Sequence, residues 1–442
     1  MSHRHFAVWM VRLTCAAVLM TPLSGSERSR SEPLSTASPS IVVTTAAELV
    51  AALSSDTGDL TVVVQPGTYQ LNHSIEVPDH VRLVGGGTML YDESDLPTGF
   101  VPESRTVIAA LAGVTGDFVT LGDGASLQGL VIQDVARPTL TGGGVVVVSS
   151  RQPGDSVSAQ IAECEIINPN PTGSAPAGPT GRGLLALTRN PRPTPGGGAP
   201  HERSDVSVRL THSIIRSPAN GSGVFGINFA AGSHVDIELR RNVIGGQFNM
   251  TGGASRPDSV VGSTLMLQSI GNLYRSDGAT PSLGWNLQGG TDAPIGGTAG
   301  ETLNNRLWVH SVDDRLEGFS TTIAAAAGRR NSAVSAGASS NELDLIVEGA
   351  RLASTTTDLQ LRGASSGVAG MAAGDGNELR VTIRQVTGSG PRTNDYVDST
   401  ALGVPAPGVG NRLLIAGSVM AFSSTNEAIS PMPDARFFTA ER

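Results

Sequence analysis

An internal repeat is the feature that most constrains the fold of this chain. Four segments of its C-terminal half, "NRLWVHSV", "NELDLIVE", "NELRVTIR" and "NRLLIAGS", begin at Asn305, Asn341, Asn377 and Asn411. These starts lie 36, 36 and 34 residues apart. Looser copies begin at Ser204, Ser233 and Ser263. Units that recur at such a period bury their apolar faces against one another rather than folding alone.

Within each strong copy the hydrophobic period is two. The third and fifth residues are aliphatic, as in Leu307 and Val309, whereas the residues between them vary. This alternation is typical of strands with one face in a core. Paired helices would show a period of about 3.6, and a propeller blade would need four strands in roughly 40 to 45 residues. The repeat therefore predicts a solenoid whose turns each contribute a few short parallel strands.

The repeat also predicts which charged side chains become neighbours. If successive turns stack about 4.8 Å apart, outward residues at matching positions face each other. The expected pairs are Asp344 with Arg380, Glu348 with Arg384, and Arg209 with Glu238.

A short helix is expected before the first strand. In "TAAELVAALSS", Thr45 and Glu48 have the spacing of a capping box, and apolar residues three and four positions apart follow them. The pattern predicts an amphipathic helix over residues 46–53.

This segment and the following "TVVVQPGTYQLNHSIEVPDHVRLVGGG" resemble the N-terminal cap and first coil of the right-handed parallel β-helix proteins, the pectin-lyase-like superfamily. The resemblance is most specific over residues 43–87, where Pro66 to Tyr69 match a "PGTY" turn, and it extends as architecture over residues 42–425. It implies an all-β fold, a right-handed single-stranded parallel β-helix solenoid with a short N-terminal capping helix. We expect this domain to span residues 41–430.

The two ends of the chain differ from this domain. A basic start, an apolar stretch and small residues make residues 1–26 similar to a secretory signal peptide. The polar residues 27–40 are typical of a disordered leader, and residues 431–442 form a C-terminal tail. We therefore expect a secreted or periplasmic protein. Cys15 leaves lipidation as an alternative, although its neighbours depart from the lipoprotein pattern.

Charge and cysteine content narrow the range of partners. The chain has 39 acidic residues against 30 basic ones, all arginine, and its net charge of −9 disfavours a nucleic-acid partner. No later segment is apolar enough to span a membrane, so an integral membrane protein is not expected. Cys164 is the one cysteine outside residues 1–26, and we predict a small buried thiol without an intramolecular disulfide.

One segment interrupts the repeat. Residues 168–204 are rich in proline and glycine and predict a structureless loop insertion, in which "GLLAL" is a candidate docking strand. Such a loop on a rigid scaffold has either a binding role or no role beyond sequence variation.

Enzymes of the superfamily commonly act on uronate-rich polysaccharides, so the resemblance implies two mechanisms. A polysaccharide lyase needs a strong base beside a carboxylate, and without lysine that base would be arginine. The densest arginine cluster contains Arg209, Arg216, Arg240 and Arg241, of which Arg240 and Arg241 are weak catalytic candidates. The alternative is that these strand arginines are outward ion-pair partners.

A glycoside hydrolase needs a pair of carboxylates. "HSVDDRLEGF" supplies Asp313 and Asp314, but the other motifs of the polygalacturonase-like pattern are missing in order. Aligning the repeats puts Asp314 at the place of Asn242 and Asn272, where a polar side chain caps a corner. We therefore predict that at least one of the two aspartates bonds to corner backbone.

The sequence is compatible with two functions. In the first, a secreted β-helix protein binds an extracellular polysaccharide and processes it; in the second, it is a non-catalytic structural or adhesive surface protein. No metal or cofactor is expected, because the histidines lack metal-ligand spacing and calcium repeats are missing. The oligomeric state stays open.

Overall fold

The computed structural model describes parts of the chain between residues 39 and 431. The described ranges are 39–55, 58–136, 143–170, 181–189, 203–255, 259–276, 283–292, 300–331, 337–368, 371–372, 374–388, 393–401, 410–417 and 430–431. The predicted signal peptide, most of the leader and the tail lie outside them.

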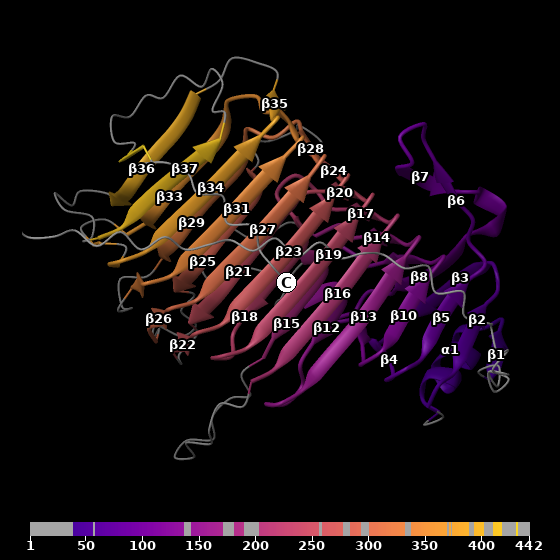
Figure 1. Cartoon of the computed structure of the whole chain (residues 1–442). Helices are drawn as coiled ribbons and strands as arrows, with labels where there is room; N and C mark the ends of the chain where they lie inside the picture. Colours follow the sequence, from indigo (N-terminus) through magenta and orange to yellow (C-terminus); the bar gives the residue numbers. More distant parts are fainter. Residues whose placement is uncertain are drawn as a thin grey trace, which may run out of the picture. The chain divides into compact units, whose positions relative to one another are not determined.

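Three long parallel sheets make up most of the described chain (Figure 1). The first sheet has 13 strands: β1 (Ser40–Val43), β2 (Thr61–Val64), β5 (Arg82–Gly85), β10 (Ala125–Gln128), β13 (Ser156–Ala162), β16 (Asp205–Thr211), β19 (His234–Arg240), β23 (Thr264–Ile270), β27 (Arg306–Val312), β31 (Glu342–Glu348), β34 (Glu378–Arg384), β37 (Arg412–Gly417) and β38 (Ser430–Pro431).

The second and third sheets have 10 strands each. The second contains β3 (Gly67–Leu71), β8 (Thr106–Ala110), β11 (Val131–Gln133), β14 (Glu165–Ile167), β17 (Ile214–Arg216), β20 (Val243–Gly245), β24 (Leu273–Arg275), β28 (Arg315–Glu317), β32 (Arg351–Ala353) and β35 (Thr387–Gly388). The third contains β4 (Ile75–Val77), β9 (Val119–Leu121), β12 (Gly143–Ser149), β15 (Gly181–Thr188), β18 (Ser222–Asn228), β21 (Gln247–Ser255), β25 (Leu283–Asp292), β29 (Thr321–Arg330), β33 (Thr357–Ser366) and β36 (Thr393–Ala401). A smaller parallel sheet joins β22 (Val260–Val261), β26 (Thr302–Leu303) and β30 (Ala338–Ser339).

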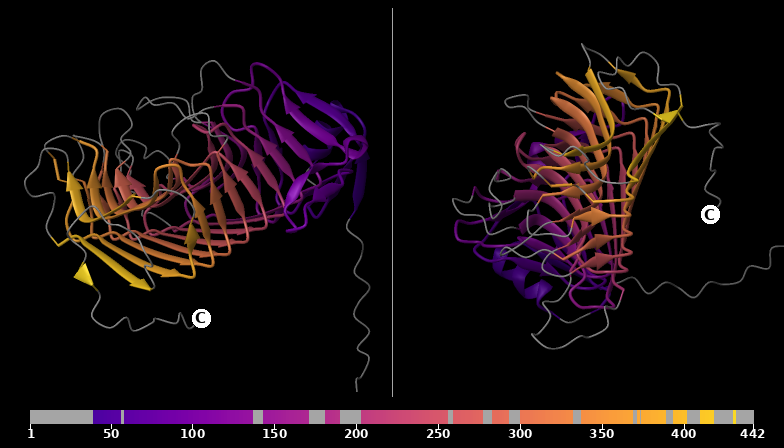
Figure 2. Two further views of the ribbon diagram at one scale, coloured as in Figure 1. Left: turned by 90° about the horizontal axis from the view of Figure 1, so that it is seen from above. Right: turned by 90° about the vertical axis from the view of Figure 1, so that its left-hand side faces the viewer.

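Each coil visits the three sheets in turn and then returns to the first, one strand further along (Figure 2). The repeats pair as predicted: Leu307 lies opposite Leu343, which lies opposite Leu379. These leucines are fully buried and stack along the core. The fold is therefore the right-handed parallel β-helix that the repeat and the N-terminal motif predict.

The helix α1 (Ala46–Leu53) has the predicted bounds and cap. Glu48 N–H donates to Thr45 Oγ1 at 3.2 Å, and the Glu48 carboxylate accepts from the Thr45 backbone in return. Leu49 and Leu53 are buried on the face that packs against the first coil. The capping box thus starts the helix, and the apolar face covers the beginning of the core.

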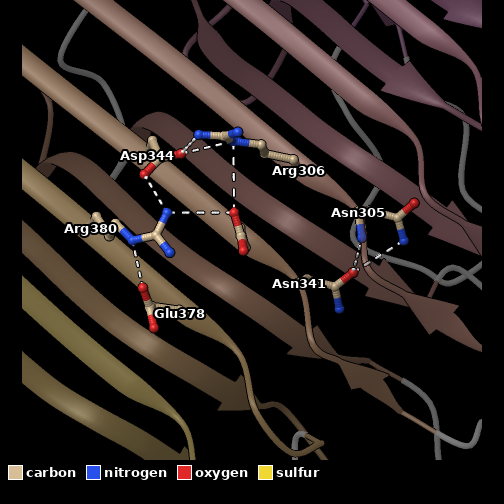
Figure 3. Close-up of polar contacts among 7 residues, drawn as sticks. Asn305, Arg306, Asn341, Asp344, Glu378 and Arg380 are labelled. Carbon is tan, nitrogen blue, oxygen red and sulfur yellow. Dashed lines mark hydrogen bonds and ion pairs between the residues drawn. The ribbon is translucent and has the colours of Figure 1, made fainter. Parts of the chain in front are cut away.

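An asparagine ladder precedes four strands of the first sheet, β27, β31, β34 and β37. Asn341 Oδ1 accepts from the backbone N–H of Asn305 at 3.0 Å, and its Nδ2 donates to the Thr302 carbonyl at 3.1 Å. Asn377 and Asn411 continue the same pattern. Figure 3 shows the contact between Asn305 and Asn341. The asparagines that begin the repeats therefore satisfy the buried corner backbone.

Glycines of the third sheet make room for this ladder. A Cβ on Gly290 would lie 2.4 Å from Asn341 Cγ, and one on Gly328 would lie 2.4 Å from Asn377 Cγ. These distances leave no space for a side chain, so the glycines at this position of β21, β25 and β29, which are Gly253, Gly290 and Gly328, are a packing requirement.

The predicted ion pairs are confirmed. Arg380 Nη1 lies 3.3 Å from Asp344 Oδ1 (Figure 3), and Arg384 Nη1 lies 2.6 Å from Glu348 Oε1. Arg209 Nη2 lies 2.7 Å from Glu238 Oε2.

The candidate docking strand is confirmed, and one further feature was not expected. Within the segment 168–204, β15 contains "GLLAL" and pairs on both sides, with β12 and β18. Its "GLLAL" residues are buried, so burial of aliphatic side chains decides the local structure, while residues 171–180 and 190–202 lie outside the described part. The unexpected feature is an antiparallel hairpin, β6 (Met89–Tyr91) and β7 (Pro97–Phe100), followed by the 3-10 helix η1 (Pro102–Ser104).

Candidate functional site

The corners of the coil differ in how much their length varies. From β13 to β35, the corner from the first to the second sheet always has two residues, such as Glu163 and Cys164. The connections on either side of the third sheet vary, from Gly246 alone between β20 and β21 to residues 189–204 between β15 and β16. Variable loops on a rigid scaffold commonly border binding surfaces. The outward face of the third sheet, which these variable connections border, is therefore the best-placed surface for a binding site.

The outward face of the third sheet changes character along the stack. In the earlier coils it is apolar, with Val147, Leu185 and Ile227 in one buried cluster. In the next coils the matching positions are amides: Phe225 lies opposite Asn249, and Asn249 lies opposite Asn286. Burying polar groups on a sheet face costs free energy unless they form hydrogen bonds.

Hydrogen bonds join these amides across three coils. Asn286 Nδ2 donates to Asn249 Oδ1 at 2.9 Å, and Gln288 Nε2 donates to Asn286 Oδ1 at 3.1 Å. Arg329 Nη1 reaches the same Asn286 oxygen at 3.4 Å, and its Nε donates to Asn331 Oδ1 at 3.0 Å. Asn249 and Gln288 are nearly buried at 7% exposure, whereas Asn286 and Arg329 are partly exposed. The buried amides thus hold the exposed groups in place.

Arginines add positive charge to this face. The Arg182 guanidinium lies 4.2 Å from the centre of the Phe225 ring. Arg362 lies opposite Ala326 on the next strand, and its charge acts on Arg329. Burial and then the Arg362 guanidinium lower the pKa of Arg329, while Asp292 opposes this shift. Two neighbouring guanidinium groups in a chain with net charge −9 form a local anion-attracting surface.

The arginines singled out from the sequence lie elsewhere. Arg240 pairs with Glu238 on the outward face of the first sheet, and Arg241 pairs with Asp95 in the β6–β7 hairpin. His212 Nε2 also lies 3.5 Å from Asp95 Oδ2. In these contacts both arginines are outward ion-pair partners.

The two candidate aspartates occupy different environments. Asp313 is exposed with a backbone φ of 56°, whereas Asp314 is fully buried. Asp314 Oδ1 accepts from the backbone N–H of Asn272 at 2.8 Å, which is the predicted corner bond, and Oδ2 accepts from Ser311 Oγ at 2.7 Å. Burial raises the pKa of Asp314 to about 6. The two carboxylates therefore share no groove in this structure.

Sequence reasoning missed the third-sheet face. The available signal was weak: "FNMTGG" and "WNLQGG" place an asparagine before one apolar residue and a second polar residue, threonine or glutamine, after it, ahead of a double glycine. Among the described residues, no group of three or more His, Cys, Asp or Glu side chains is arranged to hold a metal ion. Cys164 is a buried thiol, and burial raises its pKa to about 12. No helix in the described part of the chain has the length and hydropathy of a membrane span.

No protein-family model matches this chain, and no curated protein matches it. Among solved structures it is similar to a polygalacturonase from Erwinia carotovora ssp. carotovora, with 12% identity, coverage of 86% of this chain and 100% of that chain, and a TM-score of 0.36. It is also similar to a mannuronic acid specific polysaccharide family 6 lyase from human gut microbiota, with 14% identity, coverage of 90% and 92%, and a TM-score of 0.29. A PL6 family alginate lyase shows 11% identity, coverage of 87% and 75%, and a TM-score of 0.22.

The stacked sheets give the chain a parallel β-helix fold. The likenesses to solved structures concern that fold alone, and they assign no ligand to the third-sheet face.

Proposed function

We propose that this chain is a secreted protein that binds an acidic polysaccharide on the outward face of the third sheet, between β15 and β33. The observation that carries the proposal is the concentration of arginines and amides on that face of an otherwise acidic chain. The N-terminal pattern of residues 1–26 supports export.

The chemistry of the face suits a polymer with a repeated carboxylate. Guanidinium groups bind carboxylates through two parallel hydrogen bonds, and amides both donate to and accept from sugar hydroxyls. Asn286, Arg329 and Arg362 lie on three successive strands, which are about 4.8 Å apart. A chain that crosses the strands would therefore meet a new polar group at each coil.

The face favours binding over cleavage. Asp292, whose charge acts on Arg329, is fully buried and accepts a hydrogen bond from the Asn331 backbone N–H. A carboxylate held in this way is a structural acceptor and cannot leave its partner to serve as a base without exposing a buried donor. A non-catalytic adhesive protein is accordingly one form of this proposal.

The test compares polygalacturonate and alginate oligomers by calorimetry, with the double variant Arg329→Gln and Arg362→Gln. Loss of charge-assisted hydrogen bonds should weaken binding at least about tenfold, and added salt should weaken wild-type binding in the same direction. Arg306→Gln is the matched control, because Arg306 is paired with Asp344 on the first sheet. Equal affinity of the double variant and the control would refute the proposal.

Ultraviolet absorbance of the same mixtures detects unsaturated products, and reducing ends detect hydrolysis. Turnover on either polymer would replace the binding role with an enzymatic one. Sequencing the N-terminus of the exported protein tests secretion, and we expect cleavage near Ser26.

A further inference from the structure

The first sheet has a depression on its outward face. Its volume is about 270 Å³, and it lies over β10, β13, β16 and β19. Gly124, Ser158 and Ser207 are small exposed residues at neighbouring positions in three successive coils, so the surface is low there. The longer side chains of Arg209 and Asp236 border it.

The depression gathers polar groups with unused hydrogen-bonding capacity. Arg209 and Glu238 hold each other, with Nε 2.7 Å from Oε2. In the described part of the chain, by contrast, the Asp236 carboxylate, the Gln160 amide and the Ser207 hydroxyl form no hydrogen bond with the protein. Burial raises the pKa of Asp236, and Glu238 adds to this effect, while His234 and Arg209 oppose it. Asp236 is partly buried, whereas Gln160 and Ser207 are exposed, so a ligand in the depression would meet one partly desolvated carboxylate and two accessible polar groups.

The mixture of donors and acceptors narrows the class of ligand. The carboxylates of Asp236 and Glu238 would repel an anion in the depression, and the Arg209 guanidinium would repel a cation. A neutral hydroxyl group both donates and accepts, so it can bond to Asp236 and to Gln160 without like-charge repulsion. The volume is near the lower end for small-molecule sites, as expected for one sugar ring.

An apolar platform continues the same row of outward positions. Asp236 lies opposite Met266, and Met266 lies opposite Trp308. Both apolar side chains are partly exposed, and the Trp308 ring contacts the edge of His310 with centroids 5.7 Å apart. A tryptophan on an otherwise polar face provides a surface for the apolar face of a sugar ring.

From this arrangement we infer that the first sheet carries a second site, which binds a neutral oligosaccharide running across the strands. One sugar occupies the depression and bonds to Asp236, and further units pass over Met266 and Trp308. The site is independent of the third-sheet face, because it uses different strands, a different sheet and a ligand without charge.

Calorimetry with the full chain and three neutral probes, cellohexaose, mannohexaose and galactohexaose, tests the inference. At least one probe should bind, and Asp236→Ala and Trp308→Ala should each weaken it by about tenfold. Asp205→Asn is the control, since Asp205 lies on β16 but is paired with Arg203 outside the depression. Its affinity should equal that of the wild type. Thermal unfolding of each variant checks that the coil is intact.

Hexagalacturonate separates the two sites. The variants Asp236→Ala and Trp308→Ala should leave its binding unchanged, and the Arg329 and Arg362 double variant should leave the neutral probe's binding unchanged. Failure of all three neutral probes to bind would overturn the inference, whatever the acidic probe does. The same holds if a folded Asp236→Ala and a folded Trp308→Ala both bind the neutral probe as tightly as the wild type.

Discussion

At the scale of single residues, Asp314 differs from the asparagines that occupy the same corner in neighbouring coils, because its side chain has no N–H donor. Asn242 Oδ1 accepts a hydrogen bond from the Ser213 backbone N–H, and its Nδ2 donates to the Leu210 carbonyl. Asn272 repeats this one coil later, with the Asn242 N–H as donor and the Leu239 carbonyl as acceptor. Asp314 keeps the accepting oxygen but has no amide with which to donate. The alignment of the repeats predicted this position, because all three side chains precede a strand of the second sheet.

The first prediction is that Asp314→Asn stabilises the protein above about pH 6. Burial raises the pKa of Asp314 from 3.8 to about 6, so the folded state prefers the protonated carboxyl. Its contribution is therefore full below about pH 4 and is lost as pH rises through about 6. Removing this loss should increase the free energy of unfolding by about 1 to 3 kcal/mol at neutral pH and by little at about pH 4.

Urea unfolding of both proteins across this pH range measures the effect. Asp313→Asn is the matched control, because it removes the same charge from an exposed neighbour. An unfolding free energy of Asp314→Asn that tracks the wild type at every pH would show that the carboxyl titrates without coupling to folding.

At the scale of elements, the corners before β27, β31, β34 and β37 hold the first sheet in register. Their asparagines were visible in the sequence as the first letters of the repeats, but their bonds were not predicted, because a recurring polar residue indicates a corner without saying which backbone groups it satisfies. The hairpin β6–β7 was also missed. Its Asp95 meets Arg241 across 146 residues of sequence, and no local pattern encodes such a contact.

The second prediction is that Asn341→Ala costs about 2 to 4 kcal/mol of stability, because it leaves the buried Asn305 N–H and Thr302 carbonyl without partners. Asn411→Ala removes equivalent bonds from a partly exposed corner, where water replaces them, and should cost about 1 kcal/mol. Chemical denaturation of the two variants measures the difference. Equal losses would mean that burial does not set the strength of the ladder.

At the scale of the whole molecule, the features that could be predicted from the sequence are those that recur from coil to coil. The inward aliphatic columns and the facing ion pairs recur at a constant period, so they could be aligned without a structure. The third-sheet face could not, because its outward residues change from apolar to amide to alanine along the stack and share only their position. The aliphatic run of β15 indicated a candidate strand, but its pairing partners β12 and β18 were not predicted, because prolines and glycines interrupt the repeat on both sides of it.

The third prediction uses the stack as a one-dimensional array. Deleting residues 341–376, one full coil of 36 residues, should leave a folded protein, since Asn377 then takes the place of Asn341 beneath Asn305. Leu379 replaces Leu343 opposite Leu307, and Glu378 replaces Glu342 opposite Arg306, so both the core and the charge pairing persist.

Deleting residues 341–358 instead removes half a coil. The chain that would form a first-sheet strand then continues with a third-sheet strand, so the asparagine ladder and the column of core leucines are both interrupted. Circular dichroism and urea unfolding should show cooperative, β-rich folding for the full-coil deletion, with a slightly smaller denaturant dependence because less surface is buried, and no cooperative transition for the half-coil deletion. If the full-coil deletion also failed to fold, the coils would depend on contacts beyond their immediate neighbours, and the nearest-neighbour account of this solenoid would be wrong.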